Sequence, residues 1–212
     1  TPTHNLVSAY EYVGTPDPTD PYVNRDPRLA ASIVTNGSTW NGRVIDQSAG
    51  GSDDMARTNA SRTGYYLKKF LTDGLNLTQG QTAQHNWVAY RWAEVLLNYA
   101  EAMNEAYGPD AVPAGYTMSA RQALQQVRDR ASVNLPAVTA ADKDAFRDAV
   151  KHERRIELAF EDHRYWDLLR WKDAMEVLNR PVLGVKVTRN GESWSYEVAE
   201  VATRTFHERN YY

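Results

Sequence analysis

The sequence predicts a mainly α-helical protein with long irregular loops and a small β-hairpin near its C-terminus. Three observations carry this prediction. Residues 1–85 are rich in glycine, proline and asparagine and show little sustained periodicity. From residue 90 onward, successive segments repeat apolar side chains at the three- and four-residue spacing of amphipathic helices. Two alternating segments then flank Asn190 and Gly191, a dipeptide typical of a hairpin turn.

These features divide the 212 residues into three regions. Residues 1–85 form an irregular, loop-rich region, which we expect to face a ligand because long irregular segments in compact proteins are often functional. Residues 86–180 form a helical scaffold, and residues 181–212 form a β-hairpin with a truncated tail. The chain stops on two tyrosines without a closing turn, so we expect it to be part of a larger protein.

Composition narrows the class of protein. The formal net charge of −3 and the pI near 6.0 indicate no basic surface for nucleic acid. No apolar run approaches the roughly 18 residues of a membrane-spanning helix, and any export signal would lie outside the chain. The absence of cysteine excludes disulfides and zinc–thiolate sites. The 6 tryptophans and 13 tyrosines, against 4 phenylalanines, suit surfaces that stack on sugars or peptides, and they also suit ordinary helix packing.

The helical scaffold is predicted to begin with two antiparallel helices, followed by a third. The first spans residues 90–107, and the second spans 119–132 with Ser119 as its N-cap. The third begins after Thr139, the expected N-cap, and runs to about residue 161.

The remaining predicted elements are shorter. After a break near residues 162–163, a short helix runs to residue 171 or 177. Alternating side chains predict strands over 64–70, 183–188 and 194–198, with a further strand over 203–212.

The stretch from Lys151 to Trp171 combines dense charge with apolar residues at helical spacing. Glu153 and Glu157 lie one turn apart on the apolar face of the third predicted helix, where unpaired carboxylates would be costly. Their partners could be a substrate or other side chains of the protein. Arginine can satisfy a carboxylate with two hydrogen bonds, so we expect a structural ion-pair network. The candidate partners are Arg128, Arg130, Arg164 and Arg170.

Motifs for catalysis and metal binding are weak. His152 and Glu153 begin a zincin-like pattern, but Ile156 stands where the second histidine would be. Two glutamates on one face of one helix are poorly placed to flank a glycosidic bond. Asp53 and Asp54 are not followed by further oxygen ligands at the regular spacing of a calcium loop. No catalytic residue, metal site or cofactor is therefore predicted.

Four blocks of sequence carry a resemblance to a known family. They are RWAEVLLNYAEA at 91–102, AL at 123–124 with VRDRA at 127–131, ERRIELAFE at 153–161 and RYWDLLRW at 164–171. RDPRL at 25–29 and NYY at 210–212 fit the same pattern. Together these residues resemble the C-terminal part of the SusD/RagB family, over roughly residues 20–212.

The resemblance implies a fold, a role and a location. The family is mainly α-helical, with tetratricopeptide-like hairpins and an irregular ligand-facing region. Its members are surface-exposed outer-membrane lipoproteins of Bacteroidetes that capture glycans, or peptides in the RagB branch. They act as a lid over a SusC-like TonB-dependent transporter. We expect this chain to lack the family's N-terminal half and the cysteine that carries the lipid anchor. The family's motifs belong to its scaffold, so they imply no ligand contacts.

Candidate ligand-binding residues therefore come from local chemistry. A sugar-binding surface needs an exposed aromatic ring with planar polar side chains at its edge. Trp40 lies between two Asn-Gly turns, beside Asn41 and Arg43, and fits best, although it could instead cover the core beneath its loop. Further platforms are expected at Tyr22, Tyr65 and Tyr66. Four other tryptophans are expected to pack within the protein: Trp87, Trp166, Trp171 and Trp194.

Three functions remain open from the sequence. The first is non-catalytic binding of extracellular oligosaccharides or polysaccharides for import through the SusC-like transporter. The second is a RagB-like component or helical scaffold that binds peptides or proteins. The third is a polysaccharide-cleaving enzyme, which the lack of a convincing catalytic pair disfavours. The sequence does not name the sugar, because stacking on an indole ring tolerates many monomers.

Overall fold

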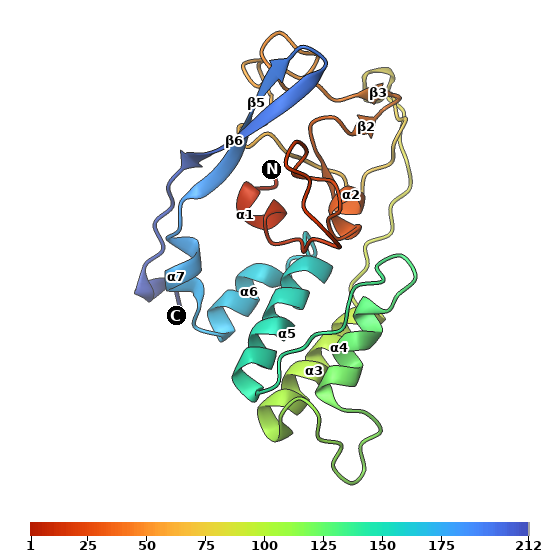
Figure 1. Cartoon of the computed structure of the whole chain (residues 1–212), viewed down its shortest axis with the longest axis vertical. Helices are drawn as coiled ribbons and strands as arrows, with labels where there is room; N and C mark the ends of the chain where they lie inside the picture. Colours follow the sequence, from red (N-terminus) through yellow and green to blue (C-terminus); the bar gives the residue numbers. More distant parts are fainter. Residues whose placement is uncertain (212) are drawn as a thin grey trace. The chain divides into compact units, whose positions relative to one another are not determined.

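A computed structural model describes residues 1–211 and shows helices and short strands joined by long loops (Figure 1). Most of the regular structure is helical, as predicted, and a β-hairpin lies near the C-terminus. The chain divides into two compact units: Trp87–Arg164, and Thr1–Asn86 together with Tyr165–Tyr212. We call these the helical unit and the loop unit. Within residues 1–211, no helix is both long and apolar enough to cross a membrane.

Three helices form the helical unit: α3 (Trp92–Tyr107), α4 (Ala120–Arg128) and α5 (Lys143–Glu157). Figure 1 shows α4 and α5 alongside α3, and their apolar stripes meet in one buried cluster. Leu97, Leu124 and Phe146 are completely buried there. Removing such side chains from water stabilises this unit by about 25 cal/mol for each Å² of apolar surface.

Side-chain caps define where two of these helices begin. Ser119 caps α4 as predicted, because its hydroxyl accepts the Gln122 N–H at 3.2 Å. The Gln122 side chain in turn accepts the Ser119 N–H at 2.8 Å, which completes a capping box. The prediction of Thr139 as the cap of α5 is wrong. The carboxylate of Asp142 accepts two N–H groups of the first turn instead, and the helix begins after it.

The third helix also ends earlier than predicted. It stops at Glu157 rather than near residue 161, because the backbone then leaves the right-handed helical region. Phe160 and Asp162 adopt left-handed conformations, with φ of 66° and 63°. Such values are uncommon outside glycine and interrupt a helix. The predicted break is present, and α6 (His163–Arg170) follows it.

Other helix boundaries shift by smaller amounts. α3 begins at Trp92 rather than at residue 90, and α4 ends at Arg128 rather than at residue 132. The short helix predicted to reach residue 171 or 177 is two helices, α6 and α7 (Ala174–Leu178). Lys172, with φ of 64°, separates them.

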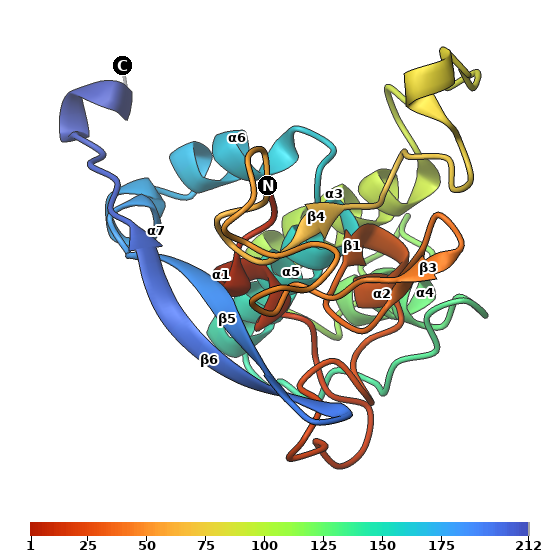
Figure 2. The same cartoon turned by 90° about the horizontal axis from the view of Figure 1, so that it is seen from above.

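The loop unit contains three small antiparallel sheets in the part of the chain that is described. They pair β1 (Ile33–Val34) with β4 (Tyr66–Leu67), β2 (Thr39–Trp40) with β3 (Arg43–Val44), and β5 (Val182–Asn190) with β6 (Ser193–Ala202). Figure 2 shows β5 and β6 as a long twisted ribbon, which extends beyond the predicted strands at both ends. Asn41 and Gly42 have φ of 50° and 71°, as the two-residue turn between β2 and β3 requires.

Strand β5 approaches the segment before β4 so closely that glycine is needed at two positions. The Val185 N–H donates to the Thr63 carbonyl at 2.9 Å. A Cβ on Gly184 would lie 2.9 Å from the Thr63 Cα, and one on Gly64 would lie 2.7 Å from Val185 Cγ1. These glycines therefore let the hairpin contact the loop backbone directly.

Short helical turns complete the loop unit: α1 (His4–Val7), α2 (Arg28–Ser32), η1 (Leu77–Gln79) and η2 (Glu208–Tyr211). The strand predicted over 203–212 is wrong for the described residues, because η2 forms there after β6 ends. The Tyr211 ring instead packs edge-on against Phe206, with centroids 5.3 Å apart. Of the strand predicted over 64–70, only β4 pairs with a neighbour.

Two tryptophans that were expected to pack are exposed. Trp87 is 75% exposed in the segment before α3, and Trp166 is 65% exposed on α6. Leu168 is the buried apolar residue of α6, and Trp166 lies about 200° from it around the helix. The predictions fail because both indoles lie outside the buried stripes. Trp171 is half-buried, with the Arg170 guanidinium 4.6 Å from its ring centroid.

Candidate ligand-binding surface

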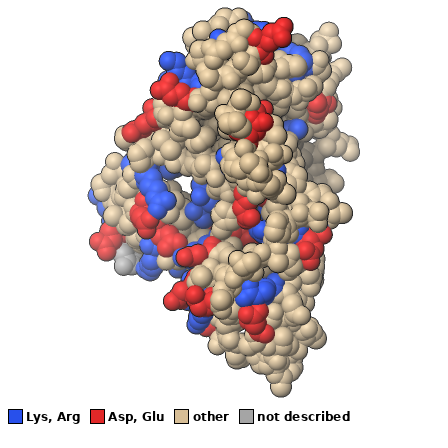
Figure 3. All heavy atoms as spheres, in the orientation of Figure 1, with Lys and Arg blue, Asp and Glu red and all other residues tan. Residues whose placement is uncertain are grey.

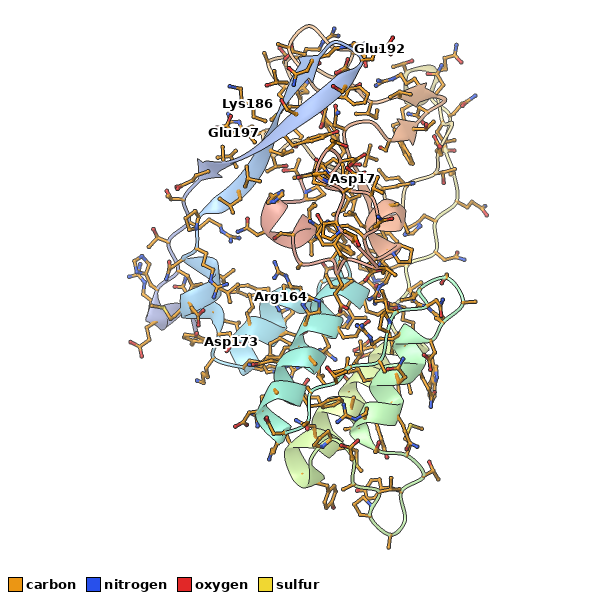
Figure 4. The ribbon with its side chains drawn as sticks, in the orientation of Figure 1. Asp17, Arg164, Asp173, Lys186, Glu192 and Glu197 are labelled. Carbon is orange, nitrogen blue, oxygen red and sulfur yellow. The ribbon has the colours of Figure 1, made fainter. Side chains whose placement is uncertain are left out.

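A groove of about 580 Å³ lies between residues 12–21 and the turn of the β5–β6 hairpin, both in the loop unit. Small-molecule sites typically measure about 300–1,000 Å³. Its most informative lining residues are three aromatic rings and three carboxylates: Tyr12, Trp194 and Tyr196, with Asp17, Asp20 and Glu192. We call this feature the hairpin groove. Figure 4 labels Asp17 and Glu192, one from each wall.

Strand β6 places two of these rings on the same face of the hairpin. Trp194 and Tyr196 are two residues apart, so their side chains point in the same direction. Tyr196 is directly opposite the buried Val187, which shows that this face turns inward. Lys186 and Glu197 face each other across the strands on the other side, where Figure 4 shows them pointing outward.

The indole of Trp194 is held by the segment around β2 and β3. Its Nε1–H donates to Asp46 Oδ1 at 3.3 Å, while Arg189 donates to Asp46 Oδ2 at 2.9 Å. Burial acts to raise the pKa of Asp46, but hydrogen bonds from Ser48 and Trp194 outweigh it and lower the pKa. Gly37 lies against the ring, since a Cβ there would be 3.5 Å from Trp194 Cζ3. The ring is therefore fixed in one position, as a stacking surface requires.

Tyr196 contacts a series of partly buried polar aromatic residues. Its ring meets Tyr22 edge-on at 5.3 Å, and Asn36 donates to its hydroxyl at 3.3 Å. Tyr22 donates to the Tyr65 hydroxyl at 3.4 Å, which lies 2.7 Å from His4 Nδ1. Burial raises the pKa of Tyr22 and Tyr196 and raises the pKa of Tyr65 to about 12. All three therefore remain neutral hydroxyls near pH 7.

The opposite wall is a tight loop organised by one carboxylate. Asp17 Oδ1 accepts the N–H and the hydroxyl of Thr19, each at 2.7 Å, and the N–H of Asp20 at 3.1 Å. The Thr19 hydroxyl contributes most to lowering the pKa of Asp17. Tyr12 is held from behind by Arg25, whose guanidinium lies 4.0 Å from the ring centroid and donates to the Tyr12 hydroxyl at 2.9 Å.

Trp40, Asn41 and Arg43 share the β2–β3 hairpin. Trp40 is half-buried, and Asn41 fastens the turn to a neighbouring loop. The Asn41 N–H donates to the Asp73 carboxylate at 2.7 Å, and its side-chain oxygen accepts a backbone N–H of the 74–78 segment at 2.9 Å. Asn41 and that segment line a second hollow of about 440 Å³, which we call the Asn41 hollow.

The other predicted residues have different surroundings. Arg43 binds both oxygens of Asp53 at 2.5 and 2.6 Å, which lowers the pKa of Asp53. The Tyr66 hydroxyl accepts the Ser61 N–H at 3.1 Å and holds that loop. Tyr65 is 0% exposed, so its ring cannot serve as a stacking platform. The expectation for Tyr65 is corrected: because the side chain is enclosed by the core, it supports the surface from beneath.

Sequence reasoning did not select the residues of the hairpin groove. Trp194 was expected to pack, and it does contact Gly37 and Asp46, but it also lines the groove. The Asn-Gly turn and the alternation of Trp194 and Tyr196 were a usable signal, because together they place both rings on one hairpin face. The loop that faces them follows only from the tertiary fold.

The buried glutamates of the helical unit meet arginines. Arg128 Nη1 lies 2.8 Å from Glu153 Oε2, and both side chains are at least 96% buried, with exposures of 4% and 1%. Arg130 donates to both oxygens of Glu157 at 2.7 and 3.0 Å. Arg91, which the sequence analysis did not select, donates to the same carboxylate at 2.5 Å. These ion pairs connect the three helices, and both glutamate side chains point toward arginine side chains of the protein itself.

The other two arginine candidates lie on α6. Arg170 binds Asp167, three residues earlier, at 2.8 Å. Arg164 is the second residue of the helix and is labelled in Figure 4. Acidic and basic side chains are interspersed on the face shown in Figure 3. Within residues 1–211, no three His, Asp or Glu side chains gather in a way that could hold a metal ion.

Comparison with known proteins identifies the family. The model of the SusD family matches residues 1–212, and the chain therefore belongs to that family, as its motifs indicate. Relatives include two SusD-like proteins of Formosa agariphila. The protein P38 is 32% identical over 111 residues, which cover 49% of this chain and 20% of that protein. The protein P25 is 29% identical over 166 residues, which cover 71% and 30%.

Solved structures support the same assignment. A SusD-like protein from Bacteroides fragilis NCTC 9343 matches with a TM-score of 0.80 and 29% identity, over 99% of this chain and 42% of that one. A second protein of that strain, described as a SusD-like carbohydrate binding protein, matches with a TM-score of 0.77 and 31% identity. This match covers 100% of this chain and 45% of that protein. The chain thus spans less than half the length of these relatives.

Proposed function

We propose that the chain binds extracellular oligosaccharides or polysaccharides, with the hairpin groove as its main contact surface. The observation that carries the proposal is the fixed indole of Trp194 in a groove that also holds two tyrosines and three carboxylates. A sugar ring has an apolar face that can stack on an indole, and its hydroxyls donate readily to carboxylates. Hydrogen bonds to charged groups contribute about 1.5–3 kcal/mol each when water is displaced.

Membership of the SusD family supports the proposal of glycan binding. A member with 31% identity over the whole of this chain is described as carbohydrate binding. The shared scaffold by itself implies no sugar contacts, so the proposal depends on the groove as well as on the family.

The proposed role extends to import. A SusD family member of this kind would deliver its glycan to a SusC-like TonB-dependent transporter at the outer membrane, where a lipid anchor would hold it at the cell surface. The support is the family assignment of residues 1–212.

We propose binding without cleavage. A glycosidase needs one carboxylic acid with a raised pKa to protonate the leaving group. In the hairpin groove, the pKa of Asp17 is lowered, which makes this carboxyl a poor acid. Glu153 and Glu157 are each paired with arginines and would not act as a catalytic pair.

The β2–β3 hairpin is a proposed second contact surface. Trp40 offers a half-buried ring, Arg43 keeps a partly exposed guanidinium, and Asn41 borders its own hollow. Tyr22 acts through Tyr196, which it supports. Tyr66 acts by holding the loop that precedes it.

Peptide binding of the RagB kind is the second candidate function. The acidic side chains Asp17, Asp20 and Glu192 in the hairpin groove favour it, because they would attract lysine or arginine side chains.

Native affinity electrophoresis in gels that contain soluble polysaccharides tests the proposal. We expect at least one polysaccharide to retard the protein, with no release of reducing sugar, and Trp40→Ala to weaken that retardation without lowering the melting temperature. Unchanged retardation would remove Trp40 from the surface. A protein that passes every gel unretarded but binds basic peptides would favour the RagB-like function instead.

A further inference from the structure

We propose that the hairpin groove selects neutral glycans and rejects glycans that carry sulfate or carboxylate groups. This inference rests on the proposed function and names the class of sugar that the site would take. It follows from the charges that line the groove and from the state of the nearby arginines.

The charged residues of the groove are all acidic. Asp17 and Asp20 come from one wall and Glu192 comes from the hairpin turn of the other. No lysine or arginine is among the residues that line the groove in the described part of the chain. Hydrogen bonds from Thr19 lower the pKa of Asp17, which keeps this carboxylate charged in neutral and mildly acidic solution.

Two arginines lie close to the groove, and both are occupied. Arg25 donates to the carbonyls of Pro21 and Tyr10 at 2.8 and 2.7 Å, and it also binds the Tyr12 hydroxyl. Arg189 donates to Asp46 at 2.9 Å and to the Gly191 carbonyl at 3.1 Å. These hydrogen bonds hold both guanidinium groups against the walls of the groove, and neither arginine lines it, although the Arg189 side chain is 57% exposed.

The two loop carboxylates are held in a way that suits hydroxyl groups. Asp17 receives its three hydrogen bonds through Oδ1 alone, and Asp20 accepts the Tyr22 N–H through Oδ1 at 2.9 Å. In the described part of the chain, no hydrogen bond is formed by Oδ2 of either residue. Each carboxylate is therefore oriented by one oxygen and offers the other as an acceptor. A sugar hydroxyl can donate to it, whereas a sulfate or carboxylate oxygen cannot.

An anionic sugar in this groove would meet repulsion in place of hydrogen bonds. The charges are near solvent, so water and salt weaken the effect, and we expect discrimination on the order of tenfold at low ionic strength. The discrimination should shrink as salt is added, because screening removes the repulsion.

The test compares one polysaccharide in two forms. A neutral polysaccharide that retards the protein is lightly sulfated, and the affinity of each form is measured by isothermal titration calorimetry. We expect the sulfated form to bind about tenfold more weakly at low salt. The double variant Asp20→Asn with Glu192→Gln should recover several-fold of that loss, since both replacements keep an acceptor oxygen and remove a charge.

Glu197→Gln is the matched control, because Glu197 lies on the outer face of the same hairpin and does not line the groove. Its preference for the neutral form should equal that of the parent.

The inference is overturned if the sulfated form binds as tightly as the neutral form, or if the double variant keeps the full preference. In either case, loss of neutral-glycan binding in Trp194→Ala would leave the proposed function standing. If Trp194→Ala binds the neutral form like the parent, the proposed function fails, and this inference fails with it.

Discussion

The position of the Tyr196 ring in the hairpin groove depends on a short series of partly buried contacts between single residues. His4, Tyr65, Tyr22 and Tyr196 follow one another through hydrogen bonds and ring contacts, and only Tyr196 lines the groove. Burial keeps the hydroxyl of Tyr65 neutral, so it can donate to His4 Nδ1 at 2.7 Å. When Tyr65 donates this hydrogen bond, His4 is neutral and carries its proton on Nε2.

We predict that stability falls as the pH drops below about 6.5, the ordinary pKa of histidine. Burial, together with the nearby positive charge of Arg25, lowers the pKa of His4 in the folded protein. The unfolded chain therefore binds a proton at a higher pH than the folded one. The contribution of His4 to stability is complete above pH 6.5 and is lost as the pH falls toward its folded pKa. Thermal melts from pH 7.5 to pH 5 measure this loss.

The variant His4→Gln is the control for this prediction, because the glutamine oxygen can accept from Tyr65 and does not titrate. Its melting temperature should fall less steeply between pH 7 and pH 5. Equal slopes for the variant and the parent would show that His4 is not the titrating group.

Exposure was the property of single residues that the sequence predicted least well. Trp40 was expected in a turn-rich loop between two Asn-Gly sequences, and Asn41 and Gly42 do form a turn, because Asn-Gly sequences specify local backbone geometry. Tyr65 and Tyr66 are adjacent and chemically alike, yet one is completely buried and the other is half-buried. The Tyr65 hydroxyl contacts His4 and Tyr22, which are distant in sequence. Local pattern carries no information about such contacts.

At the scale of elements, one carboxylate joins the ends of three helices. Glu157 ends α5, Arg130 follows α4, and Arg91 directly precedes α3. The Glu157 side chain is 2% exposed and accepts hydrogen bonds from both arginines. Arg91 also binds Glu161 at 2.7 and 2.8 Å. The buried carboxylate of Glu157 therefore receives hydrogen bonds from planar guanidinium groups, and these bonds offset the cost of removing its charge from water.

We predict that Glu157→Ala lowers the free energy of unfolding by about 2–4 kcal/mol. The loss includes both hydrogen-bonded pairs and leaves a cavity, but Arg91 keeps Glu161 and the partly exposed Arg130 can turn to water. Denaturant unfolding of the parent and the variant measures the difference.

Glu105→Ala is the matched control, since Glu105 also binds an arginine, Arg147, at 2.5 Å but is 41% exposed. Its cost should stay below about 1 kcal/mol. A Glu157 variant that is as stable as the Glu105 variant would refute the structural role of the network and reopen the question of a ligand.

Helix ends show which local signals are strong enough to read from a sequence. Ser119 and the Asn41–Gly42 turn were predicted because their side chains or backbone freedom act within a few residues. The position where α5 ends was predicted wrongly, because neither phenylalanine nor aspartate prefers a left-handed backbone strongly enough for Phe160 and Asp162 to predict one. The tertiary structure imposes that conformation.

At the scale of the whole molecule, the sequence blocks that identify the family and the groove proposed to bind a ligand lie in different parts of the chain. Three of the four family blocks lie within the helical unit, where they build the buried cluster and the ion pairs, and the fourth forms most of α6. The family and the mainly helical fold were therefore readable from the sequence. The hairpin groove lies in the loop unit and joins residues 12–21 to residues 192–196. No motif links these two segments, and only folding brings them together.

Glycan binding by the hairpin groove should depend on the indole of Trp194. The dissociation constant for a polysaccharide that retards the protein is measured for the parent, for Trp194→Ala and for Trp92→Ala, a 64% exposed tryptophan of α3. Circular dichroism confirms that each variant is folded. We expect a rise of roughly tenfold or more for Trp194→Ala, since truncating an aromatic residue at the centre of an interface costs about 2 kcal/mol or more, and little change for Trp92→Ala. A folded Trp194→Ala protein with the affinity of the parent would show that the hairpin groove is not the glycan-binding surface.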